Sequence, residues 1–353
     1  NVFAIQDAVS REIGNAVLAR FGRSATTSVP RRGTESEEAY NLYNTALYLI
    51  DKATRDDSAR AAELLDRVVE IDSDYAQAWA VRAHAYCQFA HYGGGSPISI
   101  FPVAEPMLER ALSLDPDNAI AYAIRGTINR DYHWNFRQAY EDLLRSIELN
   151  PAIAMGYRIL GGLYYRDGRF SEAVEAEKKA LDLHPTSLMD HKMLGDYLIA
   201  AGRSDEGIAQ LNRVIAMSPS FVPAYWSLWK IHHVRGEEAQ AFQYFIAGKQ
   251  LASGNEEYVA RLRAIYDVSG WRGVLRGELE QVRSQNPHRR YSSSKVYAAQ
   301  LAAQLGELEL AFQYLEGALE HRLIGLSYLK VEPLFSPLRK DRRYEDLVRR
   351  AGL

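Results

Sequence analysis

The chain is poor in the residues on which disulfide-linked and membrane-spanning proteins depend. Its 353 residues include a single cysteine, Cys87, so no disulfide can form within the chain. One lone thiol fits a reducing compartment, and we expect a cytoplasmic location while leaving export open. The sequence has no run of 18 apolar residues, so we expect no segment that spans a membrane.

The sequence also lacks the motifs of enzymes and metal sites. Its nine histidines form no H-E-x-x-H pattern, and there is no C-x-x-C pair, nucleophile elbow or protein-kinase signature. His232 and His233 are adjacent, but neighbouring side chains on a helix point about 100° apart and cannot share one ligand set. We therefore predict a protein that is not an enzyme and that holds no cofactor and no metal.

The chain also lacks a large excess of positive or of negative residues. The formal net charge is −3, with 25% charged and 47% hydrophobic residues, which is ordinary for a globular chain. Such a balance gives no general attraction to nucleic acid or to anionic membranes, so neither is expected as a partner. The chain begins with Asn1 rather than Met, and we expect it to be a piece of a longer protein.

What the sequence does contain is a pattern written several times at a fixed interval. Pro151, Pro185 and Pro219 stand 34 residues apart, and Pro116 stands 35 residues before Pro151. A glycine follows 17 residues after each of the last three prolines, whereas the earliest copy has DYHWNF there. The matching positions six, ten and seventeen residues after the prolines are Tyr122, Tyr157, His191 and Tyr225; Gly126, Gly161 and Gly195; and Gly168, Gly202 and Gly236. A period near 34 with two apolar stretches predicts stacked helix pairs.

Each recurring residue type has a physical use in such a pair. Gly161 and Gly195 let the second helix of a unit approach the first, and Ala173 and Ala180 complete the contact from the other side. The glycine at the end of the first helix supplies a left-handed backbone at little cost. Between the first and second helices expected in the second unit lies the segment HYGGGSPISIFP, which is longer than the equivalent connection in later units and which we interpret as a surface insertion.

These residues resemble the tetratricopeptide repeat. The signature positions of that family are matched in one unit by Tyr157, Leu160, Gly161, Tyr164, Ala173, Ala180 and Pro185. Glu177 departs from the pattern, because a bulky apolar residue is usual there. The resemblance implies an all-α fold, a right-handed solenoid of about seven to eight helix pairs, in which stacked first helices line a concave groove.

We divide the chain into five parts on this pattern. The predicted parts are an N-terminal amphipathic helix at 1–21, a linker at 22–34, a repeat array at 35–253, degenerate and C-terminal repeat-like pairs at 254–330, and a C-terminal turn with a capping helix at 331–353. The amphipathic helix needs a partner surface and could join two copies of the chain. The first and last parts, with the repeats between them, resemble the C-terminal repeat region of bacterial signalling proteins whose effector is an adenylate cyclase, a Ser/Thr kinase or a winged-helix regulator.

The expected groove is basic and aromatic at its centre. The register places there Arg158, Tyr165, Arg166, Lys192, Asp196, Trp226, Lys230 and His233. Guanidinium and ammonium groups beside aromatic anchors suit an acidic peptide or a terminal carboxylate, so we expect a protein or peptide partner. The alternative is a solvated face on which Lys192, Asp196 and Lys230 form a structural charge ladder.

Three functions fit these expectations. The first is a non-catalytic protein-interaction scaffold that forms the regulatory or partner-binding tail of a signalling protein. The second is a sensor for a small anionic ligand in the same groove. The third is an accessory region of an enzyme whose catalytic domain precedes Asn1.

Overall fold

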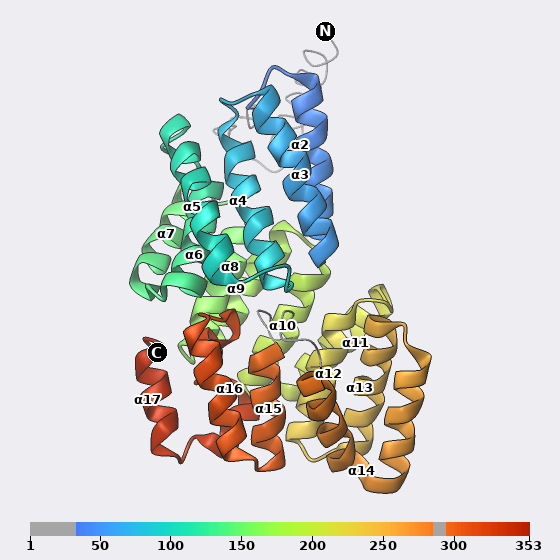
Figure 1. The fold of residues 1–353 in the computed structure, drawn as a ribbon. Helices are drawn as coiled ribbons and strands as arrows, with labels where there is room; N and C mark the ends of the chain where they lie inside the picture. Colours follow the sequence, from blue (N-terminus) through green and yellow to red (C-terminus); the bar gives the residue numbers. More distant parts are fainter. Residues whose placement is uncertain (1–32, 285–293) are drawn as a thin grey trace.

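The computed structural model describes residues 33–284 and 294–353, and within these ranges every regular element is a helix (Figure 1). The amphipathic helix expected at 1–21, and all of the linker at 22–34 except its last two residues, lie outside the described residues. None of the helices in the described ranges combines the length and the apolar character that crossing a bilayer requires.

The helices follow one another with short connections. In order they are α2 Glu37–Asp51, α3 Arg55–Ile71, α4 Ala76–His91, α5 Pro97–Leu114, α6 Ala119–Ile128, the π-helix η1 Asn129–His133, α7 Phe136–Leu149, α8 Ala154–Arg166, α9 Phe170–Leu183, α10 Leu188–Ala200, α11 Ser204–Met217, α12 Val222–Val234, α13 Glu238–Ser253, α14 Glu256–Ser284, α15 Ser294–Leu305, α16 Leu308–Glu320, the 3-10 helices η3 Ile324–Tyr328 and η4 Pro333–Leu338, and α17 Arg342–Arg350.

Consecutive helices pack as pairs, and the pairs stack into an α-solenoid, as the sequence predicts. Helix α14 is itself two segments that meet at Gly270, where φ is 62° and ψ is −165°. Counting these segments as one pair, α2 to α16 form eight pairs, and α17 follows as a last helix.

The glycine between the two helices of a unit has the predicted role. Gly168 and Gly202 have φ of 74° and 81°, in the left-handed region, and the second helix starts two residues later. A residue with a Cβ is strained in this conformation, so the fixed position of the glycine sets where each pair turns.

The earliest of the 34-residue units turns differently. Its interval to the next proline is one residue longer, and the first helix ends in a π-helical turn over Asn129–His133. A π-helical turn accommodates one extra residue. Trp134 follows with φ of 56° and takes the left-handed position that a glycine holds in the later units.

The prediction of a surface insertion between α4 and α5 is wrong from Pro97 onward. Helix α5 begins at Pro97, and Phe101 is fully buried in the core. Proline at the first position of a helix loses no backbone hydrogen bond, because that N–H has no partner inside the helix. The connection is therefore short, and the additional residues lengthen a helix.

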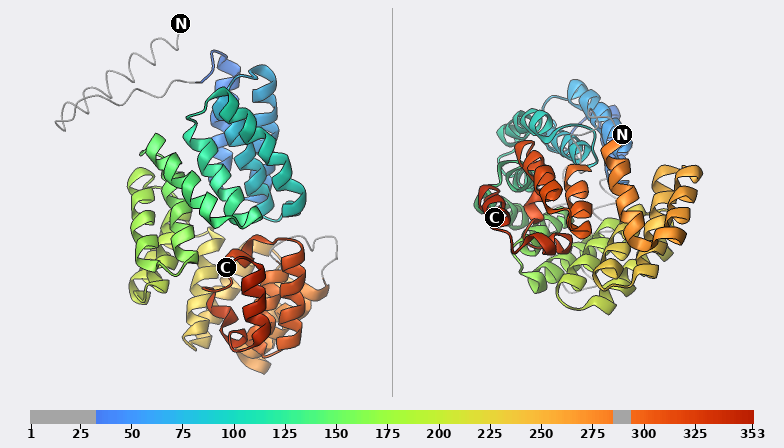
Figure 2. Two further views of the ribbon diagram at one scale, coloured as in Figure 1. Left: turned by 90° about the vertical axis from the view of Figure 1, so that its left-hand side faces the viewer. Right: turned by 60° about the horizontal axis from the view of Figure 1, so that its bottom comes forward.

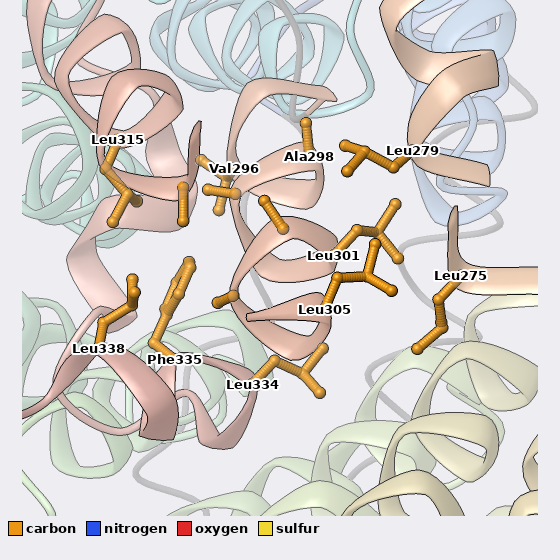
Figure 3. Close-up of a cluster of buried hydrophobic side chains, with 14 of the residues drawn as sticks. Leu275, Leu279, Val296, Ala298, Leu301, Leu305, Leu315, Leu334, Phe335 and Leu338 are labelled. Carbon is orange, nitrogen blue, oxygen red and sulfur yellow. The ribbon is translucent and has the colours of Figure 1, made fainter. Parts of the chain in front are cut away.

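The apolar core is divided unequally along the chain. Four separate clusters lie between successive helices from α2 to α10. One large cluster then extends from Trp229 to Leu347, and Figure 3 shows part of it. There Leu334 of η4 lies toward Leu305 of α15, whereas Leu338 lies on the side of Leu315 of α16.

The C-terminal helices do not continue away from the array. Figure 2 shows them returning beside the middle of the chain. Specific contacts fix this return: the Arg322 guanidinium donates a hydrogen bond to the Tyr132 carbonyl at 2.7 Å, and the Lys230 ammonium pairs with Glu332 at 2.7 Å. The solenoid thus covers part of its own inner side.

Candidate functional site: the inner face and the cavity at Trp226

Three of the expected groove residues occupy equivalent positions on successive first helices. Arg158, Lys192 and Trp226 lie on α8, α10 and α12 at intervals of 34 residues. The Arg158 side chain is 28% exposed, and its Nη1 lies 3.5 Å from the Asp190 carboxylate. A contact of that length is at the limit of a hydrogen bond, so Arg158 keeps donor capacity.

Lys192 and Asp196 form the ion pair that the charge-ladder alternative predicts. Their charged atoms are 2.6 Å apart, one helical turn from each other on α10. The ladder does not continue to the next unit through Asp196, because the Lys230 ammonium pairs with Glu332 instead. Burial alone would lower the pKa of Lys230, but the charge of Glu332, the hydrogen bond to it and the charge of Asp196 together outweigh burial, so the pKa is raised.

Tyr165 and Arg166 lie beneath residues of the C-terminal part. The Tyr165 ring packs between the rings of Tyr197 and Tyr328, with centroid distances of 5.2 and 5.9 Å. Arg166 is 9% exposed and lies over the Phe136 ring, in an ion pair with Asp167. Desolvation lowers the pKa of Arg166.

His233 is held by two residues distant in sequence. Its Nδ1 accepts a hydrogen bond from the Trp271 indole at 2.9 Å, and its Nε2 lies 2.9 Å from the Gln304 amide oxygen. This arrangement fixes the neutral tautomer with hydrogen on Nε2. Burial lowers the pKa of His233, which favours the same neutral form.

The structure therefore separates the eight expected groove residues into two sets. Arg158, Lys192, Asp196 and Trp226 lie along one side, while Tyr165, Arg166, Lys230 and His233 contact the C-terminal part of the chain. The repeat period could not reveal these contacts, because they join residues from about 70 to nearly 190 positions apart.

Beside Trp226 the structure shows a cavity of about 550 Å³. It lies between α12, α13 and both segments of α14. Its lining residues are Trp226, Lys249, Ala252, Ser253, Asn255, Glu257, Tyr258, Arg261, Glu278 and Gln281. Apart from Trp226, the sequence interpretation identified none of them. The break in the repeat period after residue 253 was the only signal that the groove changes here.

A buried carboxylate organises the wall of this cavity. Glu278 is 2% exposed, forms an ion pair with Lys249 and accepts a hydrogen bond from the Tyr258 hydroxyl. Burial, followed by the charge of Glu278, raises the pKa of Tyr258. The Lys249 ammonium also lies over the ring of Trp226, with 5.6 Å to its centroid. These contacts hold both the cation and the indole in place.

Arg261 is the cation at the rim that is not neutralised by this carboxylate. Its guanidinium donates to the Gln281 amide oxygen at 2.8 Å and lies 5.3 Å from the Tyr258 ring centroid. A guanidinium stacked on an aromatic ring is oriented for a bidentate contact with a carboxylate. The cavity thus offers one aromatic wall, at Trp226, and one oriented donor.

A second group of buried polar residues lies among α4, α6 and η1. Asp131 is fully buried, receives two hydrogen bonds from Arg130 and lies 3.0 Å from His91. Burial alone would raise the pKa of Asp131, but the charges of Arg130 and His91 and their hydrogen bonds together outweigh burial, so the pKa is lowered. Burial, with Arg158 and His91 nearby, lowers the pKa of His84 to about 3. Its internal pairing gives this cluster a structural role.

No three histidine, cysteine or acidic side chains converge as a metal site anywhere in residues 33–284 or 294–353. Cys87 is buried, and burial raises the pKa of its thiol. A buried protonated thiol is a poor nucleophile.

Comparison with known proteins agrees with the repeat pattern. Residues 132–187 and 192–256 match the family model described as tetratricopeptide repeat. These segments are tetratricopeptide repeats. The match includes α8 to α13, which carry all eight groove residues and the first part of the cavity wall. No curated protein matches the sequence.

Solved structures share the fold at low sequence identity. A human IFIT1 dimer with m7Gppp-AAAA superposes with a TM-score of 0.51 and 14% identity, covering 86% of this chain and 75% of that one. A monomeric IFIT1 mutant with Gppp-AAAA has a TM-score of 0.52 and 14% identity, over 96% and 74%. The pilus biogenesis factor PilW has a TM-score of 0.46 and 17% identity, over 64% and 99%. At these identities the likeness to the two IFIT1 structures concerns the fold alone.

Proposed function

We propose that this protein is a non-catalytic interaction scaffold that holds an acidic segment of a partner protein at the Trp226 cavity. The observation that carries the proposal is the cavity itself, where Arg261 lies at the rim and the ring of Trp226 forms a wall. Stacked helical repeats present extended inner surfaces suited to peptide segments. Arg158 and Lys192 lie further along the same row of first helices, and each is paired with a carboxylate of α10.

The C-terminal part of the chain covers some of the residues expected to bind a partner. Tyr165, Arg166, Lys230 and His233 are already in contact with residues between Gln304 and Gly352. The accessible portion is therefore the row from Arg158 to Trp226 and the cavity at its end.

Three soluble probes test this proposal against its alternative. A glutamate octapeptide, a lysine octapeptide and free glutamate are titrated while tryptophan fluorescence is followed, and a Trp226→Phe variant identifies the part of the signal that belongs to Trp226. We expect the glutamate octapeptide alone to change that signal. A response to free glutamate of equal affinity would instead support a sensor for a small anionic ligand, which the size of the cavity would accommodate.

The chain offers a matched control for the charge of the cavity. Arg261→Gln removes the rim cation, whereas Arg263→Gln changes a residue two positions along α14 that bonds Gln250 at 3.5 Å and does not line the cavity. We expect about a tenfold or greater loss of octapeptide affinity in the first variant only, since a charge-assisted bond contributes about 1.5–3 kcal/mol. Equal losses in both variants would contradict a specific site.

At the level of the whole protein, we propose that the array is a regulatory tail. The support is the likeness of its end segments to the repeat regions of bacterial signalling proteins. An accessory role beside a catalytic domain is the alternative. Determining the natural coding sequence on both sides of this chain distinguishes the two, because a signalling effector and a metabolic enzyme carry different motifs.

A further inference from the structure

Two strained residues from distant parts of the chain meet in this structure. Among residues 33–284 and 294–353, three residues other than glycine have positive φ: Ala53, Trp134 and Arg322. The guanidinium of Arg322 lies 5.1 Å from the centroid of the Trp134 ring. Left-handed backbone costs an ordinary residue about 1–2 kcal/mol, so it persists only where surrounding contacts compensate.

The strain at Trp134 originates in the sequence. The unit that contains it is one residue longer than the units after it, and the π-helix η1 absorbs that residue. Trp134 then stands where Gly168, Gly202 and Gly236 stand in the later units, each with φ between 74° and 81°. A tryptophan at a position suited to glycine implies that its ring is needed there.

Contacts around this pair join the two halves of the solenoid. Arg322 donates a hydrogen bond to the Tyr132 carbonyl at 2.7 Å, and its guanidinium lies 5.6 Å from the Tyr132 ring centroid. Arg166 reaches the Gly352 carbonyl at 3.4 Å. Hydrogen bonds, cation–π contacts and the ring contact of Tyr165 with Tyr328 thus contribute to this junction.

The clusters of buried apolar residues lie on one side or the other of this junction, and the partly buried Trp134 and Ile324 pack across it. The large apolar cluster belongs to α12–α17, and the clusters of α2–α8 lie on the other side. Along the chain, the two halves are linked through α9 and α10, where the apolar cluster is the smallest of the five. Polar interfaces between parts of one chain permit relative motion more readily than large apolar ones.

We propose that Trp134 and Arg322 form a clasp that closes the solenoid into a ring, and that the two halves separate at this clasp by bending at α9 and α10. Opening would uncover Tyr165 and Arg166 on the inner face. The proposal concerns the conformation of the chain, and it holds or fails independently of what binds at the Trp226 cavity.

Spin labels on the two halves test the clasp directly. Arg137 of α7 and Arg349 of α17 have side chains 91% and 79% exposed, and each is replaced by cysteine for labelling in a Cys87→Ala background. Pulsed electron–electron double resonance then gives the distribution of distances between the two spin labels, one on each half. We expect one narrow population in this background. Trp134→Gly and Arg322→Gly should each add a longer population, and glycine keeps the left-handed backbone without strain.

Arg343→Ala is the matched control. Like Arg322, Arg343 lies over an aromatic ring, 4.1 Å from the Phe312 centroid, and its partners, which include the carboxylates of Glu309 and Asp341, are all within the C-terminal half. It should leave the distance distribution unchanged. Three results would overturn the proposal: two glycine variants that match the background, an Arg343→Ala variant that shifts as much as they do, or a background that is already broad.

Discussion

The two halves of this solenoid are stabilised in different ways. From α2 to α10, the buried apolar residues form separate clusters between neighbouring helices, and alanine is frequent in them. From α12 to α17 they form one cluster that includes Trp229, Phe245, Trp271, Phe312 and Phe335. The first half is a row of nearest-neighbour contacts, whereas the second resembles the core of a compact domain.

This difference explains where the repeat pattern ends. A repeat needs the same close contact in every unit, so small residues recur at fixed places. A shared core needs only that the total volume be filled, so residue types can vary from helix to helix. The degenerate sequence after residue 253 thus marks a change in packing, while the helical architecture continues.

The largest expected effect comes from removing one side chain from the shared core. Phe335 is fully buried, and Phe335→Ala should lower the free energy of unfolding by about 3–5 kcal/mol. Hydrogen exchange should accelerate throughout α12–α17. Leu143→Ala, at a fully buried position of α7, should accelerate exchange only in α6–α8. Val268→Ala, at an 86% exposed position, is the control and should stay within about 0.5 kcal/mol. If hydrogen exchange accelerated over equally many helices in the first two variants, the result would contradict the difference in packing between the halves.

A smaller effect is expected at the close helix contacts of the first half. A Cβ on Gly195 would lie 2.8 Å from Leu211 Cγ and 3.2 Å from the Gly207 carbonyl oxygen. Gly195→Ala should therefore cost about 1–3 kcal/mol in thermal or denaturant unfolding. At Gly161 the nearest atom would be 3.3 Å away, so Gly161→Ala should cost less, partly offset by the higher helix propensity of alanine. The reverse order would show that the packing register is misassigned.

Two buried glutamates are expected to affect the free energy of unfolding in opposite directions. Glu177 is fully buried, and neither carboxylate oxygen has a hydrogen-bond partner, whereas Glu278 is paired with Lys249 and Tyr258. We expect Glu177→Met to stabilise the protein at pH 7 by about 1–3 kcal/mol, because an unsatisfied buried group is removed. Glu278→Met should destabilise it by a similar amount, because Lys249 loses its partner.

The pH dependence sharpens this contrast. Burial, then the charge of Asp190, raises the pKa of Glu177 well above its ordinary value of 4.5. The folded protein therefore binds a proton that the unfolded chain releases. This contribution to stability is complete below pH 4.5 and is lost as pH rises through the folded pKa. Denaturant unfolding between about pH 4 and 8 measures it, and the decline should be absent in Glu177→Met. Glu148→Gln, at a side chain 70% exposed, should leave the decline unchanged.

Much of the fold follows from local sequence. The helix pairs, their glycine turns and their small-residue contacts recur with the 34-residue period, and this pattern is strong in the residues from Pro116 to Ser253. The structure confirms the α-solenoid that the period predicts. The sequence already identified Glu177 as a departure from the family pattern. In the structure this carboxyl group is fully buried, which raises its pKa.

Less of the candidate site could be predicted from the sequence. The row Arg158, Lys192 and Trp226 follows from the period, but Lys249, Arg261 and Glu278 lie beside Trp226 only because α13 and α14 fold against α12. The contacts of Lys230 with Glu332 and of His233 with Gln304 depend on the return of the C-terminal part.

The helix pairs follow from local sequence, because each pair is set by contacts within about 34 residues that recur at fixed spacing. The coverage of the inner face and the contact between Trp134 and Arg322 instead follow from how the units stack in three dimensions. Those outcomes depend on the small rotation between successive units, summed over the whole array. The sequence of a single unit does not reveal this summed rotation. Two residues from opposite halves of the chain therefore meet although no local sequence pattern predicts the contact.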